Sequence, residues 1–212
     1  MNTLRAVLFD LDGTFADTAP DLGGAVNRLR AEHGLEPLAI GIMRARASSG
    51  ARGLLNAGFG LTPESEGYRV LRDRFLELYA EKLCVETRLF DGIPELLAAI
   101  EARKLPWGIV TNKAKRFTEP LLERLGFGKR AACVVSGDST PHIKPHPAPL
   151  ELAAALLRLP TAACLYSATI CATLKARAPR ACALPPPAGV TSAKAPIPAP
   201  GTPRRCSPIL AT

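Results

Sequence analysis

The chain has 212 residues, of which 47% are hydrophobic, and it carries a formal net charge of +8. This length allows either one domain with a full core or a core with a smaller inserted unit. No apolar run approaches the length of a membrane span, and residues 6–9 are too short for the hydrophobic segment of a signal peptide. The composition therefore predicts a cytoplasmic protein without a membrane partner.

The excess positive charge belongs to the C-terminal part of the chain. All 19 acidic residues lie at or before Glu151, and residues 1–151 hold 20 basic residues. A nucleic-acid partner, which a uniform positive charge would suggest, is therefore disfavoured. The basic tail also lacks aromatic residues for base stacking after Tyr166.

The cysteines predict neither a disulfide framework nor a zinc site. They form no C-x-x-C pair and show no metal-type spacing with the three histidines, so free thiols are expected. The six are Cys84, Cys133, Cys164, Cys171, Cys182 and Cys206.

In chain order, residues 5–10 first predict a buried strand that ends in two carboxylates, Asp10 and Asp12. Gly13 then allows a sharp turn, although an Asp-Gly pair is also an ordinary turn former. Residues 20–33 predict a helix, which Gly34 ends.

The next part of the chain predicts a helical insertion, because no second strand pattern appears before Trp107. Residues 41–61 fit no clear element. The sequence Thr-Pro-Glu at 62–64 is typical of a helix start, and apolar residues at helical spacing follow it to Leu83.

Strand and helix patterns alternate after residue 90. This alternation predicts an α/β fold with a doubly wound parallel sheet. The resulting division is a core at 1–17 and 88–166, a helical cap at 18–87 and a non-native tail at 167–212. The expected elements are helix from 94, strand 106–111, helix 114–125, strand 133–136, helix 147–157 and strand from 163.

Several motifs together resemble the haloacid dehalogenase superfamily of hydrolases, most closely its phosphoglycolate phosphatase branch. These are DLDGT at 10–14, FDG at 90–92, IVTNK at 109–113 and KPHP at 144–147. The second aspartate of the first motif favours a phosphatase, because dehalogenases of the superfamily lack it. The resemblance implies a Rossmann-like core and hydrolysis of a small phosphorylated metabolite.

The resemblance also implies roles for individual residues. Asp10 would attack phosphorus to give an aspartyl-phosphate, and Asp12 would act as general acid and base. Mg²⁺ would bind the Asp10 carboxylate and the Asp12 backbone carbonyl. Lys144 would neutralise the transferring group, although a surface lysine beside a proline is the simpler alternative.

Further residues would bind the substrate. Thr111, Asn112 and the turn amides around Gly13 would hold phosphate oxygens. Arg52 would bind a substrate carboxylate or sugar, the alternative being a solvated arginine. His146 would shape its turn, and no histidine is given a catalytic role.

One motif of the superfamily is missing. An acidic pair is expected after the fourth strand, but no carboxylate side chain follows Glu151. One added base before the codon of Ser167 would allow residues 167–175 to be re-read as Val-Gly-Asp-Asp-Leu-Arg-Asp-Ile-Glu. We hypothesise that the tail is the product of a single-base frameshift. This hypothesis predicts a disordered tail, a sheet without its last strand, weak Mg²⁺ binding and little activity.

The sequence leaves the substrate open. A phosphatase of 2-phosphoglycolate is the leading hypothesis, and a phosphatase of N-acetylmuramate 6-phosphate or another sugar phosphate is the alternative. A non-catalytic phosphate-binding protein that has kept Asp10 is a third possibility.

Overall fold

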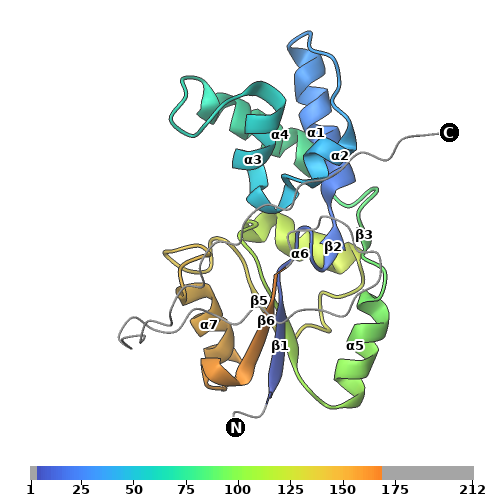
Figure 1. The fold of residues 1–212 in the computed structure, drawn as a ribbon, viewed down its shortest axis with the longest axis vertical. Helices are drawn as coiled ribbons and strands as arrows, with labels where there is room; N and C mark the ends of the chain where they lie inside the picture. Colours follow the sequence, from blue (N-terminus) through green and yellow to red (C-terminus); the bar gives the residue numbers. More distant parts are fainter. Residues whose placement is uncertain (1–3, 169–212) are drawn as a thin grey trace, which may run out of the picture. The chain divides into compact units, whose positions relative to one another are not determined.

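A four-stranded parallel sheet forms the centre of the computed structural model, which describes residues 4–168. Its strand order is β5-β4-β1-β6. Strands β1, β5 and β6 are labelled in Figure 1. In sequence order the core strands therefore run 3-2-1-4, which matches the first four positions of the Rossmann order 3-2-1-4-5-6. The strands are β1 (Ala6–Phe9), β4 (Trp107–Val110), β5 (Cys133–Val135) and β6 (Cys164–Ser167).

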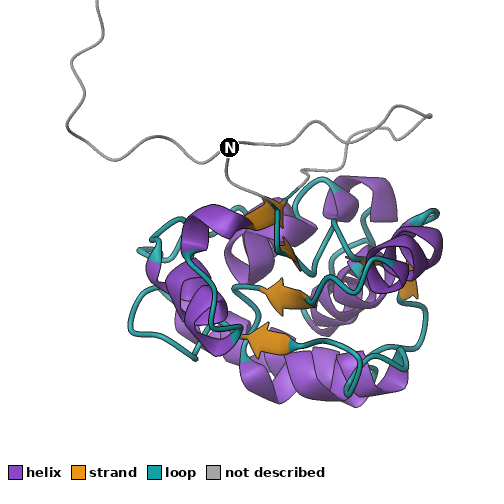
Figure 2. Ribbon diagram, turned by 90° about the horizontal axis from the view of Figure 1, so that it is seen from below, coloured by secondary structure: helices purple, strands orange, loops and turns teal. Residues whose placement is uncertain are grey.

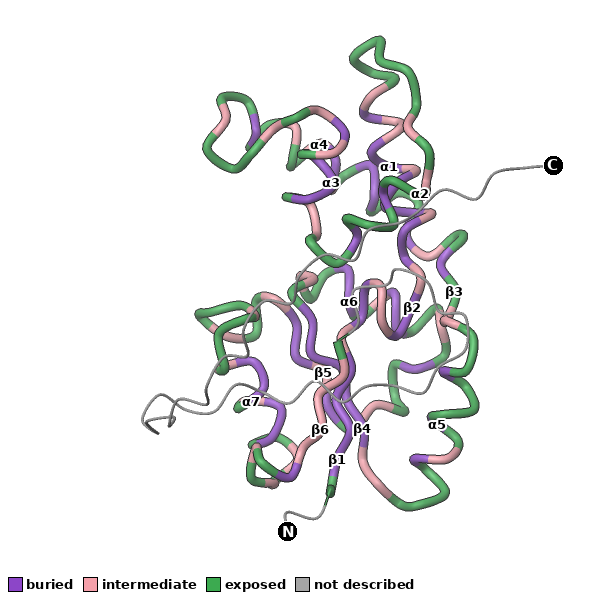
Figure 3. Tube along the Cα trace, viewed as in Figure 1, coloured by how far each residue is buried: buried purple, intermediate pink, exposed green. Residues whose placement is uncertain are grey.

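Helices cover both faces of this sheet (Figure 2). Because side chains alternate along a strand, Phe9 packs on the face of α5 (Ile93–Ala102) and α6 (Lys115–Arg124). Leu8 packs on the opposite face with α7 (Ala148–Leu156). Both central strands are fully buried (Figure 3). The predicted doubly wound α/β fold is confirmed.

A group of helices is inserted between the first and second core strands. In this group α1 packs against α2, α3 and α4. The predicted helical insertion is confirmed, whereas the division at residues 17 and 88 stays a prediction. The helices are α1 (Ala19–Glu32), α2 (Ile40–Arg44), α3 (Gly50–Phe59) and α4 (Tyr68–Glu81), with a short 3-10 turn η1 (Ala47–Ser49). A second 3-10 turn, η2 (Thr161–Ala163), precedes β6.

The chain passes from the core to the inserted helices near residue 17 and returns near residue 88, and a short antiparallel strand pair joins these two crossings. It consists of β2 (Ala16–Asp17) and β3 (Arg88–Leu89). Beside it, the buried Asp21 carboxylate accepts hydrogen bonds from the backbone amides of residues 85–87 and from the Thr87 hydroxyl. The two crossings are thus tied together by backbone pairing and by one carboxylate.

Two features differ from the sequence prediction. The Thr-Pro-Glu run at 62–64 does not start a helix, because the chain turns there and α4 begins only at Tyr68, after Gly67 at φ +77°. Residues 41–61, which showed no clear pattern, form α2, η1 and α3.

The prediction of a disordered, frameshifted tail falls almost entirely outside the described residues. Within residues 4–168, none of the helices is both long and apolar enough to cross a bilayer.

Candidate active site

Asp10 directly follows β1 at the carboxyl edge of the sheet, next to β6. The reversal of strand order between these neighbours is where α/β sheets bind ligands. The Asp10 backbone amide donates to the Ser167 carbonyl (3.0 Å), and the Leu11 amide donates to Asp10 Oδ1 (2.8 Å). These bonds fix the carboxylate at the end of the strand.

Lys144 forms an ion pair with Asp10, with 2.7 Å between Nζ and Oδ1. The same ammonium donates to the Val110 carbonyl (2.8 Å) and the Tyr166 hydroxyl (2.6 Å). Burial raises the pKa of Asp10, and Lys144 offsets part of this rise. The pKa of the Tyr166 phenol is also raised, by burial and by the negative charge of Asp10, so it remains a neutral partner.

Asn112 holds the backbone of Lys144 through two reciprocal hydrogen bonds. Its Nδ2 donates to the Lys144 carbonyl (3.0 Å), and its Oδ1 accepts from the Lys144 amide (2.9 Å). Both atoms of this amide are therefore engaged, which makes Asn112 a support for Lys144. The structure brings Asn112, Lys144 and Asp10 together, as the sequence predicts for one site.

Asp12 is buried and held by two groups. Lys113 Nζ lies 3.1 Å from Oδ1 and 3.4 Å from Oδ2, and the Thr18 hydroxyl donates to Oδ1 at 2.7 Å. Burial disfavours the charged form of Lys113, but Asp12 and Tyr79 more than offset this, so its pKa is raised. The pair is therefore a buried ion pair.

Thr111 and Gly13 shape the backbone around the two carboxylates. Thr111 directly follows β4, and its buried hydroxyl accepts a hydrogen bond from the Lys113 amide at 3.1 Å. Gly13 adopts φ +78°, in the left-handed region that glycine favours, and its amide donates to the Ala16 carbonyl at 3.0 Å. A Cβ on Gly13 would lie 3.8 Å from Ser48 Cβ, so η1 lies against this turn.

The donor set fits a hard dication only in part. The Asp10 carboxylate and the Asp12 carbonyl are oxygen donors of the kind that Mg²⁺ prefers, and water or phosphate can supply further ligands. Within residues 4–168, however, no group of three His, Cys, Asp or Glu side chains could hold a metal ion. The described site thus supplies only part of a magnesium shell.

Residues 4–166 match the family model of haloacid dehalogenase-like hydrolases. The chain belongs to this family. The resemblance drawn from the motifs is thereby confirmed, and the match ends one residue before the region that lacks the last acidic motif.

Curated relatives from this family carry two different names. Over 163 residues the chain is 46% identical to N-acetylmuramic acid 6-phosphate phosphatase of Pseudomonas aeruginosa, covering 77% of this chain and 72% of the relative. Over 162 residues it is 37% identical to phosphoglycolate phosphatase of Xanthomonas campestris, covering 76% and 73%.

Solved structures of similar proteins show the same fold. A crystal structure described as a predicted phosphoglycolate phosphatase from Haemophilus somnus superimposes with a TM-score of 0.67 and 26% identity, covering 78% of this chain and 77% of that one. A haloacid dehalogenase-like hydrolase from Bacteroides fragilis gives a TM-score of 0.68 at 19% identity, covering 77% and 78%. The second likeness shows the fold alone.

Arg52 lies apart from the carboxylates. It is exposed on α3 and lines a pocket of about 370 Å³ together with Arg46, Asn56 and Glu64. Among residues 4–168 it forms no ion pair with Asp10 or Asp12. The pocket wall continues into Ser49, the neighbour of the Ser48 that lies against Gly13.

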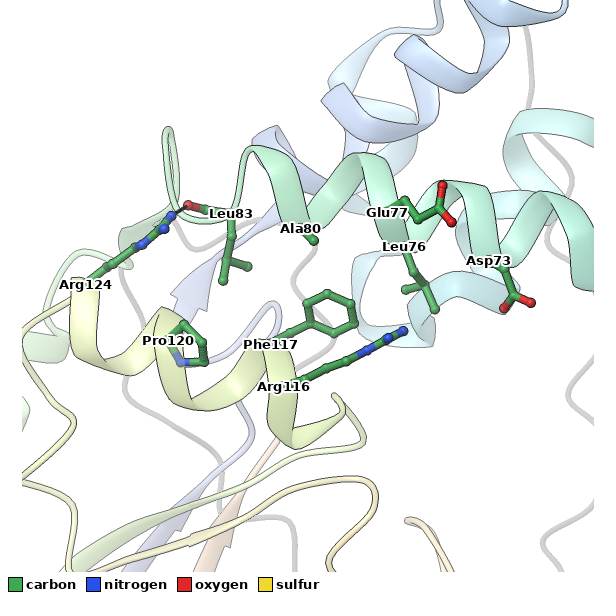
Figure 4. Close-up of a pocket in the computed structure, with 9 residues that line it drawn as sticks. All are labelled: Asp73, Leu76, Glu77, Ala80, Leu83, Arg116, Phe117, Pro120 and Arg124. Carbon is green, nitrogen blue, oxygen red and sulfur yellow. Dashed lines mark hydrogen bonds between the residues drawn. The ribbon is translucent and has the colours of Figure 1, made fainter.

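A second cavity, of about 620 Å³, lies between α4 and α6 and contains none of the predicted site residues (Figure 4). It has acidic side chains on α4, arginines on α6 and an apolar floor. Its lining residues are Asp73, Leu76, Glu77, Ala80, Leu83, Arg116, Phe117, Pro120 and Arg124.

Sequence reasoning missed two residues that hold Asp12 directly, namely Lys113 and Thr18. Lys113 ends the IVTNK motif that was recognised, so a cation next to a predicted phosphate-binding pair was an available signal. Thr18 offered only a hydroxyl before a helix, which is a common capping pattern. It makes no side-chain capping bond here and binds Asp12 instead.

Proposed function

We propose that this chain hydrolyses small phosphate monoesters by way of a phosphoryl group carried on Asp10. The observation that supports this most strongly is the pairing of each carboxylate with a lysine at the carboxyl edge of the sheet, Asp10 with Lys144 and Asp12 with Lys113. In this proposal Asp10 is the nucleophile, Asp12 is the acid and base, and the two lysines are the cations beside them.

The reaction has two steps. In the first, Asp12, which is ionised beside Lys113 in the free site, takes a proton from solvent once the phosphate dianion is bound beside it. An Asp10 oxygen then bonds to phosphorus while the ester P–O bond breaks, and Asp12 gives this proton to the leaving oxygen. In the second, water attacks the phosphorus of the aspartyl-phosphate, and the Asp12 carboxylate takes the proton of that water. Phosphate leaves, Asp12 releases this proton to solvent, and both aspartates return to the ionised state of the free site.

The surrounding residues neutralise the charge of the phosphoryl group and fix the positions of the groups that contact it. Lys144 neutralises the phosphoryl oxygens beside Asp10, and Asn112 keeps its backbone in place. Thr111 and the turn at Gly13 form the wall next to the phosphate. Bound Mg²⁺ supplies further neutralisation of charge between phosphate and carboxylate. The Asp10 carboxylate and the Asp12 backbone carbonyl would hold it.

We further propose that residues 18–87 act as a cap for the core at 1–17 and 88–166. Arg52 then faces the non-reacting end of the substrate from the pocket beside η1, where Arg46 adds a second cation. A carboxylate or sugar hydroxyls would be recognised there.

Two substrates fit this proposal. 2-Phosphoglycolate carries a carboxylate close to its phosphate. N-acetylmuramate 6-phosphate carries a carboxylate on a larger sugar, and the higher identity to a relative named for this activity, 46% against 37%, favours it. The pocket of about 370 Å³ also leaves room beyond a two-carbon acid.

A panel of phosphate esters tests the proposal. It should include both candidates and p-nitrophenyl phosphate, each with Mg²⁺, for the chain as it stands and for a version with the tail re-read in the restored frame. We expect slow hydrolysis by the first protein and faster hydrolysis by the second, because the first lacks the last acidic motif. Both rates should vanish with Asp10→Asn. Hydrolysis that persists in Asp10→Asn would contradict the proposed nucleophile.

A non-catalytic phosphate-binding protein is the alternative, and the incomplete magnesium shell favours it. Beryllium trifluoride should then bind at Asp10 in both proteins while neither hydrolyses any ester. Substrate choice has its own test, because Arg52→Met should raise KM for the preferred ester and leave p-nitrophenyl phosphate unaffected. The exposed Arg72→Met is the matched control.

A further inference from the structure

Tyr79 links helix α4 to the charge pair at Asp12. Its side chain is 1% exposed, and the Lys113 ammonium lies 4.6 Å from the centre of its ring. The other end of this contact is the ion pair of Lys113 with Asp12 at 3.1 Å. A continuous chain of contacts therefore runs from α4 through Lys113 to the proposed acid and base.

The Lys113 ammonium lies over the face of the Tyr79 ring. The Tyr79 hydroxyl is buried and has no hydrogen-bond partner within residues 4–168. Burial raises the pKa of Tyr79 to about 12, so the phenol stays neutral. A neutral aromatic face attracts a cation through the negative potential above the ring, and this attraction strengthens when water is excluded.

The Lys113 ammonium has few other partners that fix its position. Its side chain is 7% exposed, and the only carboxylate with which it forms an ion pair in the described part of the chain is Asp12. Two of its donor directions are therefore filled by Asp12 and by the Tyr79 ring. Without the ring, this largely buried ammonium would lose one of these two partners.

Two other aromatic rings pack against the ring of Tyr79. It lies 6.4 Å from Phe75 of α4 at an interplanar angle of 11°, and 5.4 Å from Phe117 of α6 at 55°. Phe117 also lines the cavity between these helices (Figure 4). The position of the ring therefore depends on how α4 packs against α6.

We propose that Tyr79 is a positioning residue for the acid and base, because its ring holds the Lys113 ammonium against Asp12. This inference rests on the proposed function for its catalytic consequence. Through this contact, the packing of α4 against the core influences the position of Asp12, the group that gives a proton to the leaving oxygen. No part of Tyr79 touches the substrate in this scheme.

The sharpest test changes the electrostatic potential of the ring face while the shape of the side chain is kept. Tyr79→Phe removes only the unpartnered hydroxyl, and pentafluorophenylalanine at the same position keeps the shape but reverses the potential of the ring face. Tyr68→Leu is the control, because Tyr68 is another buried tyrosine of α4 and takes no part in the Lys113 contact.

The first readout does not need turnover. In ¹H–¹⁵N spectra of the lysine side chains, a buried ammonium that is paired exchanges its protons slowly. We expect one such signal that disappears in Lys113→Arg, persists in Tyr79→Phe and Tyr68→Leu, and broadens beyond detection with the fluorinated ring. Absence of the signal from the unchanged protein, or its persistence with the fluorinated ring, would overturn the proposal.

The second readout is kinetic and uses the frame-restored protein. We expect kcat to fall on the order of tenfold with the fluorinated ring while KM changes little, since a cation–π contact in a buried site corresponds to about one such factor. In a Lys113→Met background the same ring change should have no further effect on kcat. An equal fall in both backgrounds would show that the ring does not act through Lys113. If no ester is hydrolysed at all, the proposed function fails and the first readout still decides the role of Tyr79.

Discussion

The Lys144 ammonium lies 2.7 Å from the Asp10 carboxylate and also donates to the carbonyl of Val110. Asp10 follows β1 and Val110 ends β4, so one side chain ties together the ends of two neighbouring parallel strands. The third partner, the Tyr166 hydroxyl, comes from β6 on the other side of β1. Contacts at the ends of three strands thus fix Lys144 while it forms its ion pair with Asp10.

Removal of the Lys144 charge should abolish most activity. In Lys144→Met, Asp10 loses the cation that offsets part of its raised pKa, and the phosphoryl group loses its neighbouring charge. We expect kcat to fall by about 10²-fold or more, as for other groups that stabilise charge in a transition state. The exposed Lys129→Met is the control in an assay with p-nitrophenyl phosphate, and it should stay within twofold. A similar loss in both variants would indicate a general effect of charge.

Asp10→Asn should make the protein more stable at neutral pH, although it removes the nucleophile. Because burial raises the folded pKa of Asp10 above its unfolded value, the folded state binds the proton more tightly. The favourable contribution is complete below the unfolded pKa, about 3.9, and is lost as pH rises through the higher folded pKa. The neutral asparagine avoids this loss.

Thermal unfolding across pH tests the sign. The difference in Tm between Asp10→Asn and the unchanged protein should be positive at pH 7 and shrink toward zero as pH falls to about 4. The exposed Asp91→Asn should show no such trend. A lower Tm for Asp10→Asn at pH 7 would mean that pairing with Lys144 outweighs burial.

The motifs predicted that Asp10, Asn112 and Lys144 share one site, but they did not indicate that Lys113 and Thr18 hold Asp12. Asp10, Asn112 and Lys144 each follow a strand that the sequence indicates, and parallel strands bring their carboxyl ends to one edge. The Tyr79 contact depends on how α4 packs against the core, and no local pattern encodes that packing.

Local signals also misplaced the start of α4. Thr62 and Pro63 suit a helix start, yet the Ser65 hydroxyl accepts from the Thr62 amide at 3.0 Å and closes a turn instead. The paired strands β2 and β3 have two residues each, which is too short for an alternating pattern to appear in the sequence.

Asp21→Ala should destabilise the protein strongly. The buried carboxylate accepts three backbone amides and one hydroxyl, and its removal leaves these donors without partners. We expect a loss of about 2–4 kcal/mol in the free energy of unfolding. Asp73→Ala, on the exposed surface of α4, should cost less than about 0.5 kcal/mol in the same urea titration. Equal costs would show that the crossing does not depend on this carboxylate.

Gly137→Ala should disturb the site through the backbone. A Cβ at this position would lie 2.2 Å from the Asn112 carbonyl oxygen, and Asn112 holds Lys144. Since the clash is with main chain, we expect a loss of about 1–3 kcal/mol in stability together with lower kcat. Gly24→Ala is the matched control, because nothing lies within 4 Å of the added methyl group and alanine favours the helix there. It should raise stability by roughly 0.5–1 kcal/mol. Unchanged kcat in Gly137→Ala would contradict the link between this glycine and Lys144.

Restoration of the acidic motif should restore magnesium binding. The family match ends at residue 166, and no carboxylate side chain follows Glu151 in the chain as it stands. A protein that continues after Tyr166 with Val-Gly-Asp-Asp-Leu-Arg-Asp-Ile-Glu gains carboxylates for the part of the shell that Asp10 and Asp12 leave open. Isothermal titration with MgCl₂ should show at least about tenfold tighter binding than the unchanged chain, which corresponds to about 1.4 kcal/mol. The same extension with asparagine in place of its aspartates is the control, since it keeps the added length without the aspartate carboxylates. Equal affinity in all three proteins would mean that the missing motif does not limit magnesium binding, and the proposed cause of low activity would then be wrong.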